Sequence, residues 1–412
     1  MRIPVLAVVA LLLFSVLPDI YIFFDIRKYC RSDKRKKVIS WTYLGVSVLM
    51  WAFLVIVLCI PKRDEDRSIL PVMWMLYSYL TVYVPKIIYS ICSLIGRIFS
   101  RGSRKLNAGA KTGICLGVLV FILLWWGILF TRHDIVVNEV DITSAKLPES
   151  FDGFKVLQFS DAHVGTWGSD TTFVSKLVDR INSSGADMIV FTGDIVNRRS
   201  SEIDPFIPVL RRLKAPNGVY AILGNHDYAG YVDWNDPADA NKDVGRLCYE
   251  MEGKGWKLLK NQTVFITSAR NDSIVLIGVE NWGEPPFNQL GDLGKSYPVG
   301  SDRLHGLNDN MFKILLTHNP QHWSQVATKI SNIDLSLAGH THAMQMMVKL
   351  GDWKWSPAAF RYKEWGGLYN HTAKDGTPMS LYVNIGAGEV GFPARLGAAK
   401  PELTLFTLHP SK

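Results

Sequence analysis

The chain has two kinds of hydrophobic pattern, and they meet near residue 131. Before that point four long apolar runs follow one another, at residues 3–24, 38–60, 69–95 and 113–131. Each has about the 20 residues that a helix needs to cross a bilayer. The first run is longer than the apolar part of a signal peptide, and no small-residue cleavage site follows it. We therefore predict a membrane domain of four transmembrane helices over residues 1–131.

The second pattern, from residue 132 onward, consists of short apolar runs that each end in a polar residue. They read FKVLQFSD, DMIVFTGD, GVYAILGN, SIVLIGVEN, FKILLTHN and IDLSLAGH. Amphipathic segments such as TTFVSKLVDRINSSG lie between several of them. This alternation predicts an α/β domain over residues 132–412, built around buried sheets.

Charge adds an orientation to the membrane domain. The formal net charge is +8, and the first and third loops of the membrane domain are strongly basic, whereas the middle loop is balanced. The positive-inside rule places the basic loops in the cytoplasm and everything after residue 131 on the far side. This topology reverses if one run is a re-entrant or surface segment. Lys86 is the only charged residue that we place deep in a span, and it predicts a helix that is kinked, tilted or partly packed inside the bundle.

Metal-binding side chains stand at the polar ends of the predicted strands. Ligands gather at the carboxyl ends of strands in α/β folds, so we expect these side chains to meet. They offer nitrogen and oxygen but no sulfur, which suits Mn, Fe or Zn, and they are too many for one tetrahedral ion. The candidates are Asp161, His163, Asp194, Asn225, His226, His318, His340 and His342.

The order of these residues resembles a known family. Written as D-x-H, G-D, G-N-H-D, H and G-H-x-H, it is similar to the motif set of the calcineurin-like metallophosphoesterases. The flanking segments LPESFDGFKVLQFSDAHVG and YVNIGAGEVGFPARLGAAKPELTLFTL look like the membrane-associated bacterial branch similar to YaeI and YkuE. The resemblance implies a four-layer α-β-β-α sandwich and a dinuclear centre of two divalent metal ions.

Residue roles follow from the same resemblance. Asp194 would bridge the two ions, and His226 would face the substrate, where it stabilises charge or protonates the leaving oxygen. Arg395 resembles a recurrent arginine of this branch that would bind a phosphate; the alternative is a loop arginine paired with a carboxylate. The first ion would be held by Asp161, His163 and His342, and the second by Asn225, His318 and His340.

Two departures from the family pattern stand out. Many relatives have an aspartate three residues after the bridging one, which orients the catalytic histidine, but this chain has Asn197. We expect Asp227 as a substitute or a more modest rate. Relatives often continue the last motif with Gly-Gly-Gln, where this chain has Ala343, Met344 and Gln345. We expect that loop to be less flexible and more apolar.

The expected function is that of a membrane-anchored metallophosphoesterase. It would hydrolyse phosphate mono- or diesters outside the cytoplasm, at the cell (inner) membrane, including a lipid-linked substrate. The alternatives are a metal-holding regulatory module on a membrane transporter or sensor, and a general periplasmic nucleotide phosphoesterase. An aromatic and basic stretch, DWKWSPAAFRYKEWGGLYNH, could dip into lipid headgroups or cover the sandwich edge. Nucleic acid is not an expected partner, and the sequence does not indicate an oligomeric state.

Overall fold

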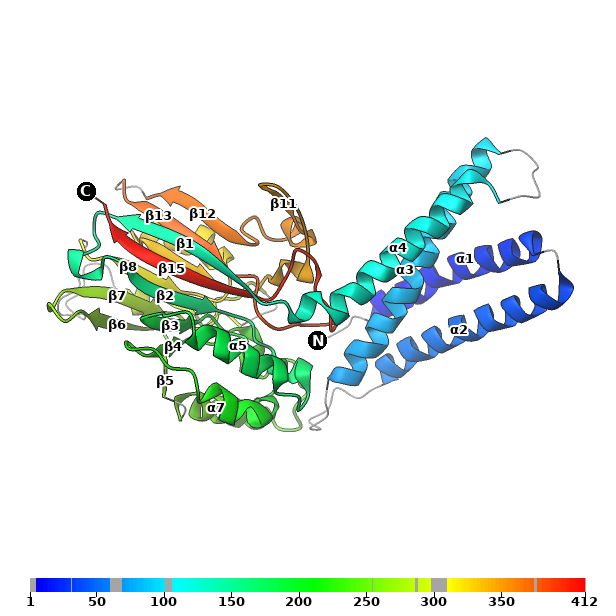
Figure 1. Cartoon of the computed structure of the whole chain (residues 1–412). Helices are drawn as coiled ribbons and strands as arrows, with labels where there is room; N and C mark the ends of the chain where they lie inside the picture. The colour runs from blue at the N-terminus through cyan, green and yellow to red at the C-terminus, as the bar shows by residue number, and fades with distance from the viewer. Residues whose placement is uncertain are drawn as a thin grey trace. The chain divides into compact units, whose positions relative to one another are not determined.

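The chain forms two compact units, which Figure 1 draws in blue to cyan and in green to red. The computed structural model describes residues 5–30, 32–59, 69–100, 106–253, 255–285, 288–297, 310–373 and 376–411. The described residues up to Phe130, with Gly391–Ala394, make the first unit, and those of Thr131–Val390 and Arg395–Lys412 make the second. The start of the first predicted span, the middle loop and part of the third loop lie outside the described residues.

The first unit is a bundle of four long helices. They are α1 (Val5–Tyr29), α2 (Asp33–Cys59), α3 (Leu70–Phe99) and α4 (Ala108–Leu129). Among the described residues, three stretches are long and apolar enough to cross a membrane, namely Asp33–Val57, Leu70–Phe99 and Ala108–His133. The predicted N-terminal transmembrane bundle is therefore confirmed, whereas its count of four spans stays a prediction.

Helices α3 and α4 can approach closely because glycines line their contact. A side chain at Gly109 would place its Cβ 2.1 Å from the carbonyl oxygen of Cys92, and one at Gly113 would meet Tyr89. Small residues of this kind let the backbones of membrane helices pack directly against each other.

The bundle also holds two ion pairs, each with a buried aspartate. Lys86 donates to Asp19 at 2.8 Å and to Ser47 at 2.9 Å, and Arg97 pairs with Asp25. Tyr43 and Tyr83 both donate to Asp19 at 2.6 Å. Lys86 is thus packed inside the bundle, but the prediction that it is the only charged residue deep in a span is wrong. A single aspartate inside an apolar run does not interrupt the hydrophobic pattern, and its partner lies 67 residues away.

The second unit holds two six-stranded sheets and a small three-stranded one. The first sheet runs β1 (Val136–Ser144), β15 (Glu402–Pro410), β2 (Phe154–Phe159), β3 (Met188–Phe191), β4 (Val219–Ala221) and β5 (Trp256–Leu258). The second runs β12 (Gly367–Thr372), β13 (Pro378–Val383), β9 (Leu335–Ala338), β8 (Lys313–Leu316), β7 (Ser273–Gly278) and β6 (Gln262–Thr267). The third runs β11 (Trp353–Trp355), β10 (Met346–Leu350) and β14 (Leu396–Gly397).

The two large sheets pack face to face, and alternate residues of each strand define the layers. Val156 of β2 joins the core between the sheets with Leu276 and Leu337 of the second sheet. Leu157 and Phe159 point the other way, into a core covered by α5 (Thr172–Asn182), α6 (Ile207–Leu210) and α7 (Pro237–Glu252). The outer face of the second sheet is covered by α8 (Leu293–Ser296) and a π-helical turn (Trp323–Ala327), which α9 (Thr328–Ile330) follows. The predicted four-layer α-β-β-α sandwich is confirmed.

The carboxyl ends of the central strands meet at one edge of this sandwich. Strands β2, β3 and β4 are parallel neighbours in the first sheet, as are β8 and β9 in the second. The buried amide of Gln158 joins the two sheets there, because it donates to Thr192 at 3.0 Å and to the carbonyl of Ala338 at 2.8 Å. Every predicted metal-binding residue follows one of these five strands.

Candidate metal centre

The loops that follow the strands hold the candidate ligands in an unusual backbone conformation. Asp161, His163, Asp194, His340 and His342 all have positive φ, between 40° and 75°. A left-handed conformation of a residue other than glycine costs on the order of 1–3 kcal/mol and persists only where the surroundings impose it. Five such residues lie at one edge of the sandwich. The surrounding structure therefore holds their side chains in place despite the backbone strain, as is common at functional sites.

Glycines before the ligands let the loops come this close. A Cβ on Gly224 would lie 2.2 Å from a carboxylate oxygen of Asp194, and one on Gly339 would lie 2.4 Å from an oxygen of Asp161. Real Cβ atoms do not approach oxygen so closely. The glycines in the segments LGNH and AGHTH are therefore needed for packing against the acidic residues.

The structure brings all the predicted ligands together. Ligand atoms lie within 4.8 Å of one another in three described groups: Asp161, His163 and His342; Asp194, His318 and His340; and His163, Asp194 and His226. Asn225 joins the second group, because its Oδ1 lies 3.2 Å from His318 Nε2. Asp194 lies between the groups, with one oxygen 3.0 Å from His318 Nε2 and 3.7 Å from His163 Nε2.

Hydrogen bonds fix which nitrogen of each ring faces the centre. The Nδ1 of His163 lies 3.0 Å from the carbonyl of Val196, and that of His318 lies 2.8 Å from the carbonyl of Thr192. A carbonyl accepts only, so in both rings Nδ1 carries a hydrogen, and Nε2 offers a lone pair inward when the ring is neutral. His340 turns the other way, because its Nε2 lies 2.9 Å from the Tyr362 hydroxyl and its Nδ1 lies 3.2 Å from His318 Nε2.

Nitrogen atoms of several rings and oxygen atoms of two carboxylates thus face the same small space. Burial, together with the neighbouring His318, lowers the pKa of His340 to about 3, and burial among other histidines lowers the pKa of His163 well below its usual value. Burial alone would also lower the pKa of His318, but the Asp194 carboxylate raises it to about 9. Neutral imidazoles are the form that binds metals, and the point beside Asp194 favours a positive charge. The donor set therefore fits divalent cations.

His226 is held at the centre by contacts on three sides. Its backbone N–H donates to Asp194 Oδ1 at 2.8 Å, and its Nδ1–H donates to the backbone carbonyl of Asn197 at 2.6 Å. Its ring stacks on Tyr231 with a centroid distance of 4.0 Å. The ring therefore lies beside His163 and Asp194 with Nδ1 already engaged.

The expected substitute role of Asp227 is wrong. Its carboxylate accepts hydrogen bonds from the backbone N–H groups of Asp194, Ile195, Val196 and Gly224, at 2.8 to 3.2 Å. It therefore shapes the loop around Asp194 and does not orient the His226 ring. The backbone of Asn197 does that instead, while the Asn197 side chain donates to Thr166 and to the carbonyl of Glu389.

Arg395 is buried and fully engaged with the backbone of its own loop. Its guanidinium donates to the carbonyls of Ile385, Gly388, Ala399 and Lys400. Neither expected role, binding a phosphate or pairing with a carboxylate, matches these contacts. Arg395 instead fixes the loop whose Gly388 N–H donates to the carbonyl of Asp161.

Two tyrosines at the centre were not predicted as site residues. The Tyr231 hydroxyl accepts from the Asn225 amide at 2.7 Å, and Tyr362 contacts His340. Tyr231 follows the GNHD motif by only four residues, so its proximity could have been inferred. Tyr362 lies in the aromatic stretch, where its placement depends on how the chain returns to the sheet.

The chain after His342 adopts the conformation that glycine prefers, although it contains none. Ala343, Met344 and Gln345 have φ of 50°, 45° and 55°. Gln345 secures the segment, since its side-chain oxygen accepts from the N–H of Val390 at 2.5 Å. The loop geometry is therefore kept, at the cost of strain, where relatives are expected to have Gly-Gly.

Comparison with known proteins agrees with this geometry. A family profile described as "Calcineurin-like phosphoesterase" matches residues 154–344, and one described as "Probable Calcineurin-like phosphoesterase, transmembrane domain" matches residues 1–132. The chain is 31% identical to the "Uncharacterized metallophosphoesterase YkuE" of Bacillus subtilis, over 67% of this chain and 86% of that protein.

Two further relatives extend the similarity into the membrane domain. The "Transmembrane protein with metallophosphoesterase domain" of Danio rerio is 26% identical over 81% of this chain and 72% of its own length. An "Uncharacterized metallophosphoesterase" of Helicobacter pylori is 26% identical over 91% of both chains.

Proposed function

Because this chain belongs to the calcineurin-like metallophosphoesterase family, we propose that it hydrolyses an amphiphilic, lipid-linked phosphate ester outside the cytoplasm. The resemblance seen in the motifs is confirmed, and the chain is a membrane-linked, metal-dependent phosphoric ester hydrolase. The residue roles, the number of metal ions, the substrate class and the side of the membrane are the proposal.

The ligand groups suggest how two divalent ions would be held. Asp161, His163 and His342 would hold one, Asn225, His318 and His340 would hold the other, and Asp194 would serve both. Bound ions of this kind polarise a phosphoryl oxygen and supply a nucleophilic hydroxide near neutral pH.

His226 would act on the leaving group. Its Nδ1–H is fixed by the carbonyl of Asn197, so in the protonated ring the Nε2–H can donate to a non-bridging oxygen or give its proton to the leaving oxygen. Tyr231 stacks on this ring and also accepts a hydrogen bond from Asn225. One tyrosine side chain thus positions both the proposed acid, His226, and a proposed metal ligand, Asn225.

One observation supports an amphiphilic substrate, namely an exposed apolar surface beside the ligands. Strands β10 and β11 form a hairpin directly after the His342 loop, and Val348 pairs with Trp355 and Leu350 with Trp353. Paired residues project from the same face of a hairpin. Val348, Leu350 and Trp353 are 44%, 69% and 56% exposed. Exposed apolar surfaces of this kind mark sites that meet a membrane, a protein or an apolar ligand, and this one follows the His342 loop directly in the chain.

The first experiment compares substrates by chain length. The full-length protein in detergent is assayed on phosphate esters that share one head group and differ in having a long or a short acyl chain. We expect kcat/KM to be about tenfold or more higher for the long chain, since an apolar side chain that is buried contributes about 1.5–3 kcal/mol. Equal values for both chain lengths would contradict the lipid-linked substrate.

A matched pair of variants assigns this preference to the hairpin. Trp353→Ser should lose most of the long-chain advantage and keep the rate on the short chain. Tyr249→Ser changes an aromatic residue of α7 that is also exposed, and it should leave both rates unchanged. If the two variants behave alike, the hairpin does not contact the substrate.

The extracytoplasmic location rests on the charge at the helix ends. Described basic residues at the end of α1 and the start of α2 include Arg27, Lys28, Lys36 and Lys37, and the positive-inside rule places that end in the cytoplasm. Asp272→Cys puts a thiol in the exposed β6–β7 turn. A membrane-impermeant maleimide should label it in intact cells, whereas labelling only after lysis would place the catalytic unit in the cytoplasm.

A further inference from the structure

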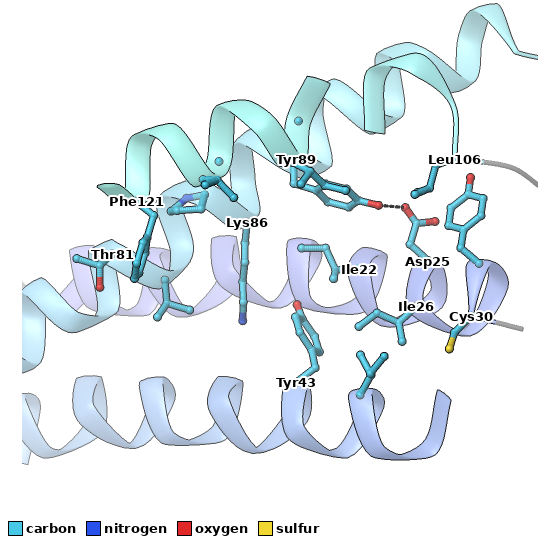
Figure 2. A pocket seen from close by; sticks show the side chains of 18 residues that line it. Ile22, Asp25, Ile26, Cys30, Tyr43, Thr81, Lys86, Tyr89, Leu106 and Phe121 are labelled. Atoms are coloured by element: carbon cyan, nitrogen blue, oxygen red, sulfur yellow. Dashed lines mark hydrogen bonds between the residues drawn. The ribbon is translucent and has the colours of Figure 1, made fainter. Parts of the chain in front are cut away.

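The membrane bundle contains a cavity of its own, separate from the ligands of the second unit. It has a volume of about 640 Å³ and is lined by all four helices, as Figure 2 shows. One end lies at Cys30 and Leu106, and the other at Thr81 and Phe121.

The cavity has about the length of one lipid leaflet. Its lining runs from Ile22 on α1 to Cys30, the residue after that helix, and from Thr81 to Tyr89 on α3. Eight residue steps of a helix rise about 12 Å, and half of the hydrocarbon core of a bilayer is about 15 Å thick. Exposed lining residues on α2 and α4, among them Ile39 and Val118, form a rim open to the surroundings. A hydrocarbon chain can therefore enter from the side.

The charged groups that line the cavity are already neutralised. Lys86 is held by Asp19 and Ser47 and lies over the rings of Tyr43 and Tyr83, at 4.4 and 4.5 Å. Asp25 is paired with Arg97 and accepts from Tyr89 at 2.9 Å, an interaction drawn in Figure 2. The interior of the cavity is therefore suited to an apolar chain, because its charged lining residues are already paired and do not attract a polar head group.

The end of the cavity near Cys30 has a different character. Here α1 and α3 finish and α2 and α4 begin, and the described charged residues are mostly basic. Asp25 and Asp33 are the acidic ones in these terminal turns, against Arg27, Lys28, Lys34, Arg35, Lys36, Lys37, Arg97 and Lys111. Such clusters at the end of membrane helices attract anionic lipid head groups.

We propose that this cavity binds one acyl chain of an anionic glycerophospholipid, whose head group lies at the basic end of the bundle. The length of the cavity, its open rim and the excess of positive charge at one end all match this ligand. The site is distinct from the proposed catalytic centre, so it does not depend on the reaction that the second unit performs.

Native mass spectrometry of the full-length protein, titrated in detergent with phosphatidylglycerol or phosphatidylcholine, tests this proposal. We expect one phosphatidylglycerol to remain bound per chain, with an affinity about tenfold higher than that of phosphatidylcholine, since each basic residue near a head group contributes on the order of 1 kcal/mol. Equal affinity for the two lipids would overturn the proposal.

Two neighbouring positions on α4 give a matched control. Val118 and Leu119 are 54% and 51% exposed, but only Val118 lines the cavity. Val118→Trp should reduce bound phosphatidylglycerol about tenfold, whereas Leu119→Trp should not. Equal binding by both variants would overturn the assignment to the cavity.

A charge variant keeps the proposal testable if a tryptophan disturbs the bundle. Arg27→Gln with Lys28→Gln changes exposed residues at the basic end and leaves the cavity lining intact. It should abolish most of the preference for phosphatidylglycerol, and retention of the full preference would contradict the proposed head-group position. Hydrolysis of a short-chain substrate by the second unit should be unchanged in this variant.

Discussion

The buried charges of the bundle and those of the candidate metal centre have different partners. In the bundle each buried charge has its opposite beside it: Asp19 meets Lys86, and Asp25 meets Arg97. The sandwich also buries a pair of Arg132 with Glu389, but its carboxylates Asp161 and Asp194 face a cluster of histidines and, among the described residues, no arginine or lysine in their ion pairs. The ion pairs of the bundle are therefore complete by themselves, whereas the candidate metal centre gathers many donor atoms that divalent cations could bind.

The comparison teaches how to separate a structural cluster from a functional one. A balanced buried pair is weak support for activity, because all its hydrogen bonds end within the protein. An unbalanced set is costly to keep and points to a ligand. The effect of substituting a residue of the candidate metal centre should therefore depend on whether metal is present. The effect of substituting a residue of the bundle should not.

The largest effect is expected from Asp194→Asn. The amide keeps the size of the side chain but removes the charge that both ligand groups share. We expect kcat/KM to fall on the order of 10³-fold, because bound ions supply several kcal/mol of transition-state stabilisation. Steady-state assays with metal analysis of the same samples measure both losses.

Thermal unfolding in chelator sharpens this result. Metal ions that bind only the folded state raise Tm, so chelation should lower Tm of the unsubstituted protein more than that of Asp194→Asn. Asp272→Asn makes the same chemical change in an exposed turn and should behave like the unsubstituted protein. Full activity in Asp194→Asn would show that Asp194 is not a metal ligand needed for the reaction.

The next effect concerns the bundle. Lys86→Met leaves the Asp19 carboxylate buried without its counter-charge, and breaking a buried pair in this way costs about 3–5 kcal/mol. We expect a large fall in the unfolding midpoint of the full-length protein in detergent, of equal size with and without chelator. Asp19→Asn added to Lys86→Met should restore part of the loss.

Lys111→Met serves as the control, because Lys111 lies exposed in the first turn of α4. It should change the midpoint little. If Lys86→Met is no more damaging than Lys111→Met, the ion pair is not a structural element of the bundle.

These two clusters also mark what the sequence can predict. The ligands of the metal centre each follow a strand directly, so local patterns place them, and the structure brings them together at one edge. Asp19 could not be paired with Lys86 from the sequence, because 67 residues and two helix turnarounds separate them. The predicted roles of Asp227 and Arg395 were wrong for a related reason. Their side chains form hydrogen bonds with backbone groups, and every residue has such groups, so the sequence does not indicate these partners.

A smaller effect should follow from Tyr362→Phe. The Tyr362 hydroxyl lies 2.9 Å from His340 Nε2, and this hydrogen bond holds the ring with Nδ1 directed at the centre. Loss of such an outer partner reduces metal affinity by about 10–100-fold. Metal titrations of the chelated protein should show this weakening, and excess metal should restore activity.

Tyr249→Phe removes a hydroxyl from an exposed tyrosine of α7 and should leave metal affinity unchanged. If excess metal fails to restore the activity of Tyr362→Phe, then Tyr362 contacts the substrate instead of positioning His340. In that case Tyr362 would be a substrate-binding residue and not a partner of a metal ligand.

The smallest effect tests the strain after the last ligand pair. Met344 has φ of 45°, and the left-handed conformation costs a residue with a side chain about 1–2 kcal/mol. Glycine relieves this but loses about 0.5–1 kcal/mol of chain entropy, so Met344→Gly should stabilise the unit by roughly 0.5–1 kcal/mol. Met346, two residues on, has an extended backbone with φ of −138°, and Met346→Gly should destabilise. Calorimetry of the two variants should therefore give Tm shifts of opposite sign, and a fall in Tm for both would show that the loop is not strained at Met344.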